Sequence, residues 1–170
     1  MSEQKVALVT GALGGIGSEI CRQLVTAGYK IIATVVPREE DREKQWLQSE
    51  GFQDSDVRFV LTDLNNHEAA TAAIQEAIAA EGRVDVLVNN AGITRDNLAM
   101  RMKDAEWDAV LDTNLKSVFR MSKLVMRGMM KARTGRIINI TSVVGSSGNP
   151  GQANYAAAKA GVAGMSRALA

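Results

Sequence analysis

The chain has 170 residues, of which 46% are hydrophobic and 23% charged, a composition typical of one folded domain with a sizeable core. Its 20 basic and 19 acidic side chains give a formal net charge of +1, so charge gives no reason to expect a nucleic acid or a membrane surface as partner. No apolar run approaches the ~18 residues of a membrane span, and the amino terminus lacks a signal-peptide pattern. The single cysteine, Cys21, cannot form an intrachain disulfide, and these features together favour the cytoplasm.

Apolar runs alternate with helical patterns along the chain. The expected strands cover residues 6–9, 31–36, 57–61, 84–88 and 136–140. The expected helices cover residues 15–28, 38–50, 66–81, 104–132 (one long helix or a broken pair) and 152–170. Continuous apolar strands between helices indicate a parallel sheet that is covered on both faces. We therefore expect a single α/β domain over residues 1–170, a doubly wound, Rossmann-like, three-layer α/β/α fold that binds ligands at the carboxyl ends of its strands.

A glycine-rich segment follows the first expected strand and opens the first expected helix. It reads Thr10-Gly-Ala-Leu-Gly-Gly-Ile-Gly17. Glycines permit a tight turn and let backbone N–H groups approach a pyrophosphate at the positive end of a helix. An ordinary glycine-rich turn is the alternative, but a position after the first strand of an alternating chain favours a dinucleotide site.

The ends of the next strands predict the rest of that site. The second strand ends without the carboxylate that would bind the 2′-hydroxyl of NAD, and Arg38 and Arg42 follow it, which favours the 2′-phosphate of NADP. The alternative for both arginines is the solvated face of a charged helix. Asp63, after the third strand, is either an acceptor for an adenine amino group or a helix N-cap. Asn89-Asn-Ala-Gly92 ends the fourth strand with small residues that suit a ribose packed against backbone.

Three polar side chains form the expected catalytic group. Ser142 follows the fifth strand, and Tyr155 and Lys159 share one face of the next helix because they are four residues apart. An ammonium beside a phenol favours phenolate, so Tyr155 is suited to pass a proton to a carbonyl oxygen while hydride reaches the carbon. Ser142 can donate a hydrogen bond to the same oxygen, and Lys159 can hold the nicotinamide ribose. Asn114, a poor interior helix former, is expected to bind a water that relays protons to Lys159.

With these motifs in place, the chain resembles the short-chain dehydrogenase/reductase family throughout its length. The motifs are the glycine-rich loop, Asn89-Asn-Ala-Gly92, Asn114, Ser142 and Tyr155-Ala-Ala-Ala-Lys159. Within the family the chain is similar to reductases of 3-oxoacyl thioesters, through Ala91-Gly-Ile-Thr-Arg-Asp96 and Gly151-Gln-Ala-Asn-Tyr155. This resemblance implies reduction with NADP(H) to a (3R)-3-hydroxyacyl thioester, a homotetramer, and Asp96 and Gln152 near the substrate mouth.

The resemblance also implies a set of cofactor-binding positions. They lie in the glycine-rich loop, after the second, third and fourth strands, and in the catalytic pair: Gly11, Leu13, Gly14, Gly15, Ile16, Gly17, Arg38, Arg42, Asp63, Leu64, Asn90, Ala91, Gly92, Tyr155 and Lys159. A metal site is not expected, because His67 has no Cys or His nearby in the sequence and reads as a surface or capping residue.

The two halves of the chain resemble different reductases within the family. Residues 1–96 look most like acetoacetyl-CoA reductases of polyhydroxyalkanoate synthesis, and residues 97–170 look more like 3-oxoacyl-[acyl-carrier-protein] reductases of fatty acid synthesis. This split suggests a natural or artificial chimera, and it leaves coenzyme A and an acyl-carrier protein both open as the substrate's carrier. A basic cluster, made of Arg127, Lys131, Arg133 and Arg136, is either a docking site for an acidic carrier protein or a set of favourable cations at a helix C-terminus.

Family members usually continue well beyond this length, so the resemblance implies that the last strands, the substrate lid and a large subunit interface are absent. The fifth strand would then form an exposed apolar edge. Two functions stay open, a thioester-reducing enzyme and a catalytically silent nucleotide-binding module. The presence of Ser142, Tyr155 and Lys159 together favours the enzyme.

Overall fold

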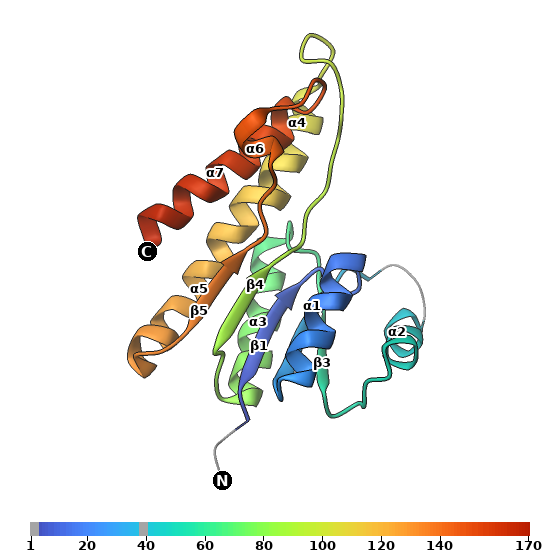
Figure 1. Cartoon of the computed structure of the whole chain (residues 1–170), viewed down its shortest axis with the longest axis vertical. Helices are drawn as coiled ribbons and strands as arrows, with labels where there is room; N and C mark the ends of the chain where they lie inside the picture. Colours follow the sequence, from blue (N-terminus) through green and yellow to red (C-terminus); the bar gives the residue numbers. More distant parts are fainter. Residues whose placement is uncertain (1–3, 38–40) are drawn as a thin grey trace.

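The computed structural model describes residues 4–37 and 41–170. Within these residues, five parallel strands form one sheet in the order β3-β2-β1-β4-β5, with helices on both faces (Figure 1). The strands are β1 (Val6–Thr10), β2 (Lys30–Val35), β3 (Val57–Leu61), β4 (Val86–Asn89) and β5 (Arg136–Asn139). The helices are α1 (Gly15–Thr26), α2 (Arg42–Glu50), α3 (His67–Glu81), α4 (Asp104–Leu111), the π-helix η1 (Asp112–Lys116), α5 (Ser117–Ala132), α6 (Val144–Ser147) and α7 (Ala153–Leu169). The α/β, Rossmann-like fold expected from the sequence is confirmed.

The three inner strands, β2, β1 and β4, are almost continuous apolar runs because the sheet is buried on both faces there, whereas the edge strands β3 and β5 are partly exposed. On one face, Ala7 and Ile31 pack with Cys21 of α1 and Trp46 of α2. On the other face, Leu8, Ile32 and Leu87 pack with Ile74 of α3 and Met121 of α5. The two hydrophobic clusters therefore have the sheet between them and fix which helices cover which face.

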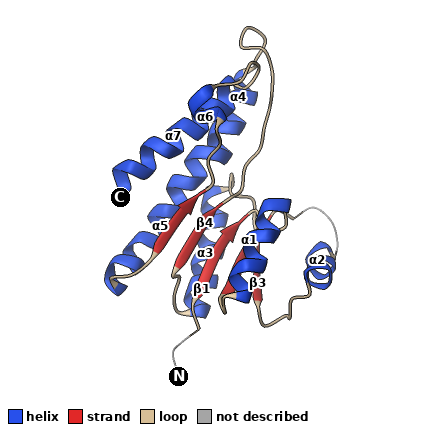
Figure 2. Ribbon diagram, in the orientation of Figure 1, coloured by secondary structure: helices blue, strands red, loops and turns tan. Residues whose placement is uncertain are grey.

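The strand order reverses between β1 and β4, which lie side by side in parallel at the centre of the sheet. The chain builds outward from β1 to β3 on one side and from β4 to β5 on the other. At such a switch point the loops after the two central strands turn apart, and a crevice opens at the carboxyl ends of the strands. Figure 2 shows the long loop that leaves β4 and leads to α4 at this end of the sheet.

Three local features differ from the expected pattern. The described part of the expected 38–50 helix begins only at Arg42, after Asp41 in a left-handed conformation at φ 61°. Of the two forms expected for residues 104–132, the structure has the broken pair, but the break is the π-helix η1, where the hydrogen-bond ladder takes in an extra residue. The short helix α6 was not predicted.

None of the helices in the described residues is both long and apolar enough to cross a membrane. Among the same residues, no group of three His, Cys, Asp or Glu side chains is placed to hold a metal ion. Cys21 is buried, and desolvation, followed by the charge of Glu50, raises the pKa of its thiol to about 12. Its thiol therefore stays protonated at neutral pH.

Candidate active site

A cleft of about 400 Å³ lies at the carboxyl ends of β1, β2 and β4. Most of the predicted cofactor positions line it: Gly11, Leu13, Gly14, Gly15, Ile16, Gly17, Arg42, Leu64, Asn90, Ala91 and Gly92. The cleft is also lined by Thr34, Val35, Val36 and Thr62, which were not predicted from the sequence because their pattern indicates only the end of a strand. The structure thus brings together loops from four separate parts of the sequence.

The glycine-rich loop fits a pyrophosphate. Gly11 has φ +64°, and a Cβ at this position would lie 2.9 Å from the Cα of Ala91. A Cβ on Gly17 would overlap the carbonyl oxygen of Gly11. Helix α1 begins after Gly14 with no side-chain cap and no acidic residue in its first turn. Its first N–H groups therefore face the cleft with a favourable dipole for a negative charge.

Thr10 and Asn90 hold the glycine-rich loop against the end of β4. The Oγ1 of Thr10 accepts hydrogen bonds from the N–H groups of Asn90 and Ala91, both at 3.0 Å. The amide of Asn90 donates back to the carbonyl oxygens of Thr10 at 3.1 Å and Gly11 at 3.0 Å. Asn90 therefore shapes the loop with its side-chain donors. The sequence did not predict this bridging role of Thr10, although Thr10 begins the glycine motif.

The far end of the cleft contains one of the two predicted arginines. Arg42 lines it from the first turn of α2, whereas Arg38 lies outside the described residues. Asp63 is exposed, and its Oδ1 accepts from the N–H of Asn65 at 2.9 Å in a local turn. The alternative interpretation of Asp63 as a helix N-cap is wrong, because α3 starts after Asn66. A contact of Asp63 with adenine stays a prediction.

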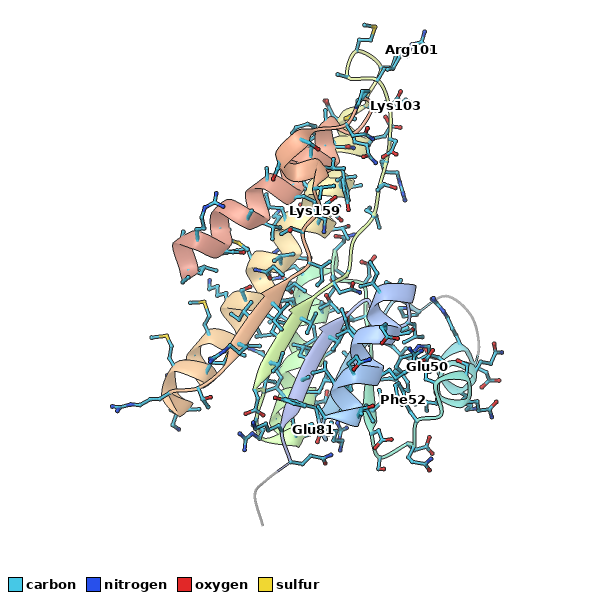
Figure 3. All side chains as sticks on the ribbon, viewed as in Figure 1. Glu50, Phe52, Glu81, Arg101, Lys103 and Lys159 are labelled. Atoms are coloured by element: carbon cyan, nitrogen blue, oxygen red, sulfur yellow. The ribbon has the colours of Figure 1, made fainter. Side chains whose placement is uncertain are left out.

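Lys159 and Tyr155 lie on α7 beside the end of β5. Lys159 is 6% exposed, and Figure 3 shows it inside the angle between α7 and the sheet. Its Nζ donates to the carbonyl oxygen of Ile140 at 2.7 Å and lies 5.6 Å from the centroid of the Tyr155 ring. Burial lowers the pKa of the Lys159 ammonium. This placement confirms the prediction that Tyr155 and Lys159, four residues apart, share one face of the helix.

Ser142 reaches the same place from the loop after β5. It is half-buried, and its Oγ accepts from the N–H of Val144 at 3.2 Å at the start of α6. Helix α6 packs closely on α7, since a Cβ on Gly145 would lie 2.9 Å from the carbonyl carbon of Lys159 and 3.1 Å from its Cβ. Ser142, Tyr155 and Lys159 therefore come from adjoining elements at the carboxyl end of β5.

Asn114 is fully buried in η1 and clamps the loop that follows β4. Its Oδ1 accepts from the N–H of Ile93 and its Nδ2 donates to the carbonyl oxygen of Ile93, both at 2.8 Å. A Cβ on Gly92 would lie 3.2 Å from the Asn114 Oδ1 and 3.9 Å from the Lys159 Nζ, so these two side chains approach the same backbone. The predicted water relay to Lys159 stays a prediction.

The two predicted substrate residues meet although 56 residues separate them. The amide of Gln152 donates to the Asp96 carboxylate at 3.0 Å. Asp96 lies on the loop between β4 and α4, and Gln152 precedes α7 by one residue. Nearby, the fully buried Asn154 bonds to the carbonyl oxygen of Arg95. Sequence reasoning quoted Asn154 only inside a motif and gave it no role.

The basic cluster of Arg127, Lys131, Arg133 and Arg136 lies at the other end of α5 and β5 from the cleft, and all four residues are exposed. In a single chain, a partner bound at this basic cluster does not lie beside Tyr155.

Of the methionines, Met121 and Met129 are in the core, and Met130 is 73% exposed. His67 is the exposed first residue of α3, which agrees with the expected surface position.

Fold and site together define a Rossmann-like α/β domain with a glycine-lined cleft, and comparison with known proteins identifies the family. Residues 5–170 match the family described as short chain dehydrogenase, and the chain belongs to that family. It is 76% identical over 170 residues to the acetoacetyl-CoA reductase of Acinetobacter sp. (strain RA3849), covering all of this chain and 68% of that protein. It is 54% identical over 169 residues to the 3-oxoacyl-[acyl-carrier-protein] reductase FabG of Salmonella typhimurium, covering 99% of this chain and 67% of that protein. The two kinds of reductase that the halves of the sequence resemble thus each match across nearly the whole chain.

Proposed function

We propose that this chain forms the cofactor-binding and catalytic part of an enzyme that reduces a 3-oxoacyl thioester to the (3R)-3-hydroxyacyl thioester with NADPH. The observation that carries the proposal is the placement of the Lys159 Nζ 5.6 Å from the centroid of the Tyr155 ring at the carboxyl end of β5, with Ser142 on the adjoining loop and a glycine-lined cleft at the same edge of the sheet. The names of the most similar relatives support the thioester, and the higher identity to an acetoacetyl-CoA reductase favours a short acyl chain on coenzyme A.

The cleft residues suit a dinucleotide. The first N–H groups of α1 would hold the pyrophosphate, and Arg42 would pair with the 2′-phosphate that distinguishes NADPH. When bound, the dihydronicotinamide supplies the hydride for the substrate's carbonyl carbon. Lys159, beside the end of β5, would hold the adjoining ribose.

The chain's own side chains handle the proton. Tyr155 donates its phenolic proton to the carbonyl oxygen as that oxygen gains negative charge. The Ser142 Oγ accepts from the Val144 N–H, so its own hydroxyl proton can point to the same carbonyl oxygen. The ammonium of Lys159, 5.6 Å from the Tyr155 ring, stabilises the phenolate until solvent returns a proton. One hydride and one proton added to the C=O bond give the alcohol.

An assembly of four chains belongs to the same proposal. Phe119 is 47% exposed and Met130 is 73% exposed, and residues eleven apart share one face of a helix. Apolar side chains of this size on the outer face of α5 support a contact between subunits.

The test of the function is steady-state oxidation of NADPH by the full-length protein with acetoacetyl-CoA, compared with simple sugars and steroids. Acetoacetyl-CoA should be reduced far faster than either, and Tyr155→Phe should lower turnover by about 10²–10⁴ with little change in cofactor affinity. Binding of NADPH without any turnover would instead support a catalytically silent nucleotide-binding module. Full activity of Tyr155→Phe would overturn the assignment of the proton donor.

A further inference from the structure

Asn154 lies one residue before Tyr155 and is 0% exposed in the first turn of α7. Its Nδ2 donates to the carbonyl oxygens of Arg95 at 2.9 Å and Glu106 at 3.3 Å. Its Oδ1 accepts from the N–H of Tyr155 at 2.8 Å. A single buried side chain therefore joins the loop after β4, helix α4 and the backbone of the proposed proton donor.

Asn154 is the buried end of a short antiparallel pairing between two segments that are far apart in the sequence. Beyond the Arg95 contact, the carboxylate of Asp96 accepts from Gln152, and the N–H of Asn97 donates to the carbonyl oxygen of Gly151 at 2.9 Å. The pairing fixes the loop that bears Asp96 against the start of α7. The position of the substrate mouth is thereby tied to the helix that bears Tyr155.

The start of α7 depends on Asn154 because the usual capping position is occupied by a residue with another role. Gln152 stands at the N-cap and makes no side-chain cap; its amide bonds to Asp96 and to Asn149 instead. The N–H of Tyr155 is in the first turn, where N–H groups lack a partner within the helix. The Oδ1 of Asn154 satisfies this N–H.

We propose that Asn154 is a positioning residue that holds Tyr155 at a fixed place relative to the loop bearing Asp96. The inference rests on the proposed function, since it assigns Asn154 to the approach of the Tyr155 phenol to a substrate held at that mouth. A general acid that is misplaced by a fraction of its hydrogen-bond length slows the chemical step more than it weakens substrate binding. Asn154 acts only through Tyr155 and the loop, without touching the reacting atoms.

The test compares Asn154→Leu and Asn154→Asp with Ile74→Val, a core change on α3 that lowers stability away from the site. In the full-length protein, Asn154→Leu should lower kcat with acetoacetyl-CoA by about 10–100-fold while KM changes much less. Asn154→Asp keeps the oxygen that accepts from Tyr155, but its carboxylate faces two carbonyl oxygens. Its rate relative to the unmodified protein should recover as the pH falls, because a protonated carboxyl can again donate to Arg95.

Hydrogen exchange gives a second measurement that does not need turnover. The amides of residues 93–97 and of Tyr155 should exchange faster in Asn154→Leu than in Ile74→Val at matched stability. Equal kcat values in these two variants, or equal exchange of those amides, would overturn the positioning role. If the unmodified protein does not reduce acetoacetyl-CoA, the proposed function fails, and the exchange data still decide whether Asn154 holds the loop to Tyr155.

Discussion

We expect the charge at the end of β2 to set which dinucleotide the cleft favours. Val35, Val36 and Arg42 line the cleft there, and none of the described lining residues carries a carboxylate. A carboxylate at this place would bind the 2′-hydroxyl of NAD and repel the 2′-phosphate of NADP. A guanidinium instead matches a phosphate with two parallel hydrogen bonds.

Arg42→Ala should therefore weaken NADPH binding by about tenfold, the loss of one charge-assisted hydrogen bond of about 1.4 kcal/mol, and leave NADH binding nearly unchanged. Fluorescence titration with both cofactors gives the two dissociation constants. Lys44→Ala is the matched control, because Lys44 is an exposed cation of the same helix that pairs with Asp41 at 2.6 Å. Equal dissociation constants for NADPH and NADH in the unmodified protein would contradict the preference.

The role proposed for Lys159 comes with a cost in stability. Its ammonium is almost fully buried with a hydrogen bond to Ile140 and no ion pair among the described residues, and burial lowers its pKa. The native state therefore binds this proton less tightly than the unfolded chain. Between the lowered native pKa and the ordinary value of 10.5, native stability rises with pH.

Lys159→Met should raise the free energy of unfolding at pH 7 by about 1 kcal/mol, because it removes a buried charge while keeping an unbranched apolar stem. The advantage in unfolding free energy over the unmodified protein should shrink as the pH rises toward 10, because the lowered pKa lets the native lysine lose its proton before the unfolded one does. Thermal unfolding at both pH values measures the two differences. Turnover should be lost at either pH. If the stability advantage of Lys159→Met grew from pH 7 to pH 10, the pKa of Lys159 would be raised in the native state and not lowered.

Between elements, the close approach of α6 and α7 brings the segment that follows Ser142 against the backbone of Lys159. A Cβ on Gly145 would lie 2.9 Å from the backbone nitrogen of Ala160. Gly145→Ala should push α6 away from α7 and lower kcat by about 10²-fold, with a smaller effect on cofactor binding, because no residue of α6 lines the glycine-rich cleft. Ser146→Ala, an exposed change on the same helix, is the control. Parallel kinetics and NADPH titrations of the two variants would separate displacement of Ser142 from general loss of structure.

The sequence predicted the elements well because apolar periodicity reports burial. All five strands and the long helices were placed near their observed limits, since α1 and α2 cover one face of the sheet and α3 and α5 cover the other. The short helix α6 and the π-helix η1 were not predicted. Neither has an apolar period: α6 has no buried residue, and η1 differs from an α-helix by one residue in the ladder.

Sequence patterns named the candidate site residues, Asn114 among them, but gave Asn154 no role and did not foresee the contact of Asn114 with Ile93. Glycines, arginine and the Tyr155–Lys159 spacing each have a local pattern that indicates their role. The amide of Asn154, in contrast, meets the carbonyl oxygen of Arg95 across 59 residues, and that of Asn114 meets Ile93 across 21 residues. Contacts between a side chain and a distant backbone carbonyl leave no periodic trace in the sequence.

Over the whole molecule, the two ends of the sheet have different roles. The cleft, Tyr155 and Lys159 lie at the carboxyl ends of the strands, and Glu81 lies at the opposite end (Figure 3). The carboxylate of Glu81 on α3 pairs with Lys30 of β2 at 3.0 Å and with Arg58 of β3 at 2.5 Å. This ion-pair network ties α3 to β2 and β3, and none of its three residues lines the cleft, so it should affect stability and leave chemistry unchanged.

Glu81→Gln tests that separation through pH. Burial alone would raise the pKa of Glu81, but the hydrogen bonds from Arg58 and Lys30 outweigh it and the pKa lies below its ordinary value. A lowered native pKa means that the carboxylate stabilises the fold above the unfolded value of 4.5, and that this stabilisation is lost as pH falls through the native pKa. Glu81→Gln should therefore lower the free energy of unfolding at pH 7 by about 1 kcal/mol, or Tm by about 2–4 °C, with a gap that closes on acidification and an unchanged kcat. Glu76→Gln, an exposed change on the same helix, is the control and should show no such pH-dependent difference in unfolding free energy. An equal difference in both variants would show that the ion pairs of Glu81 do not contribute to acid stability.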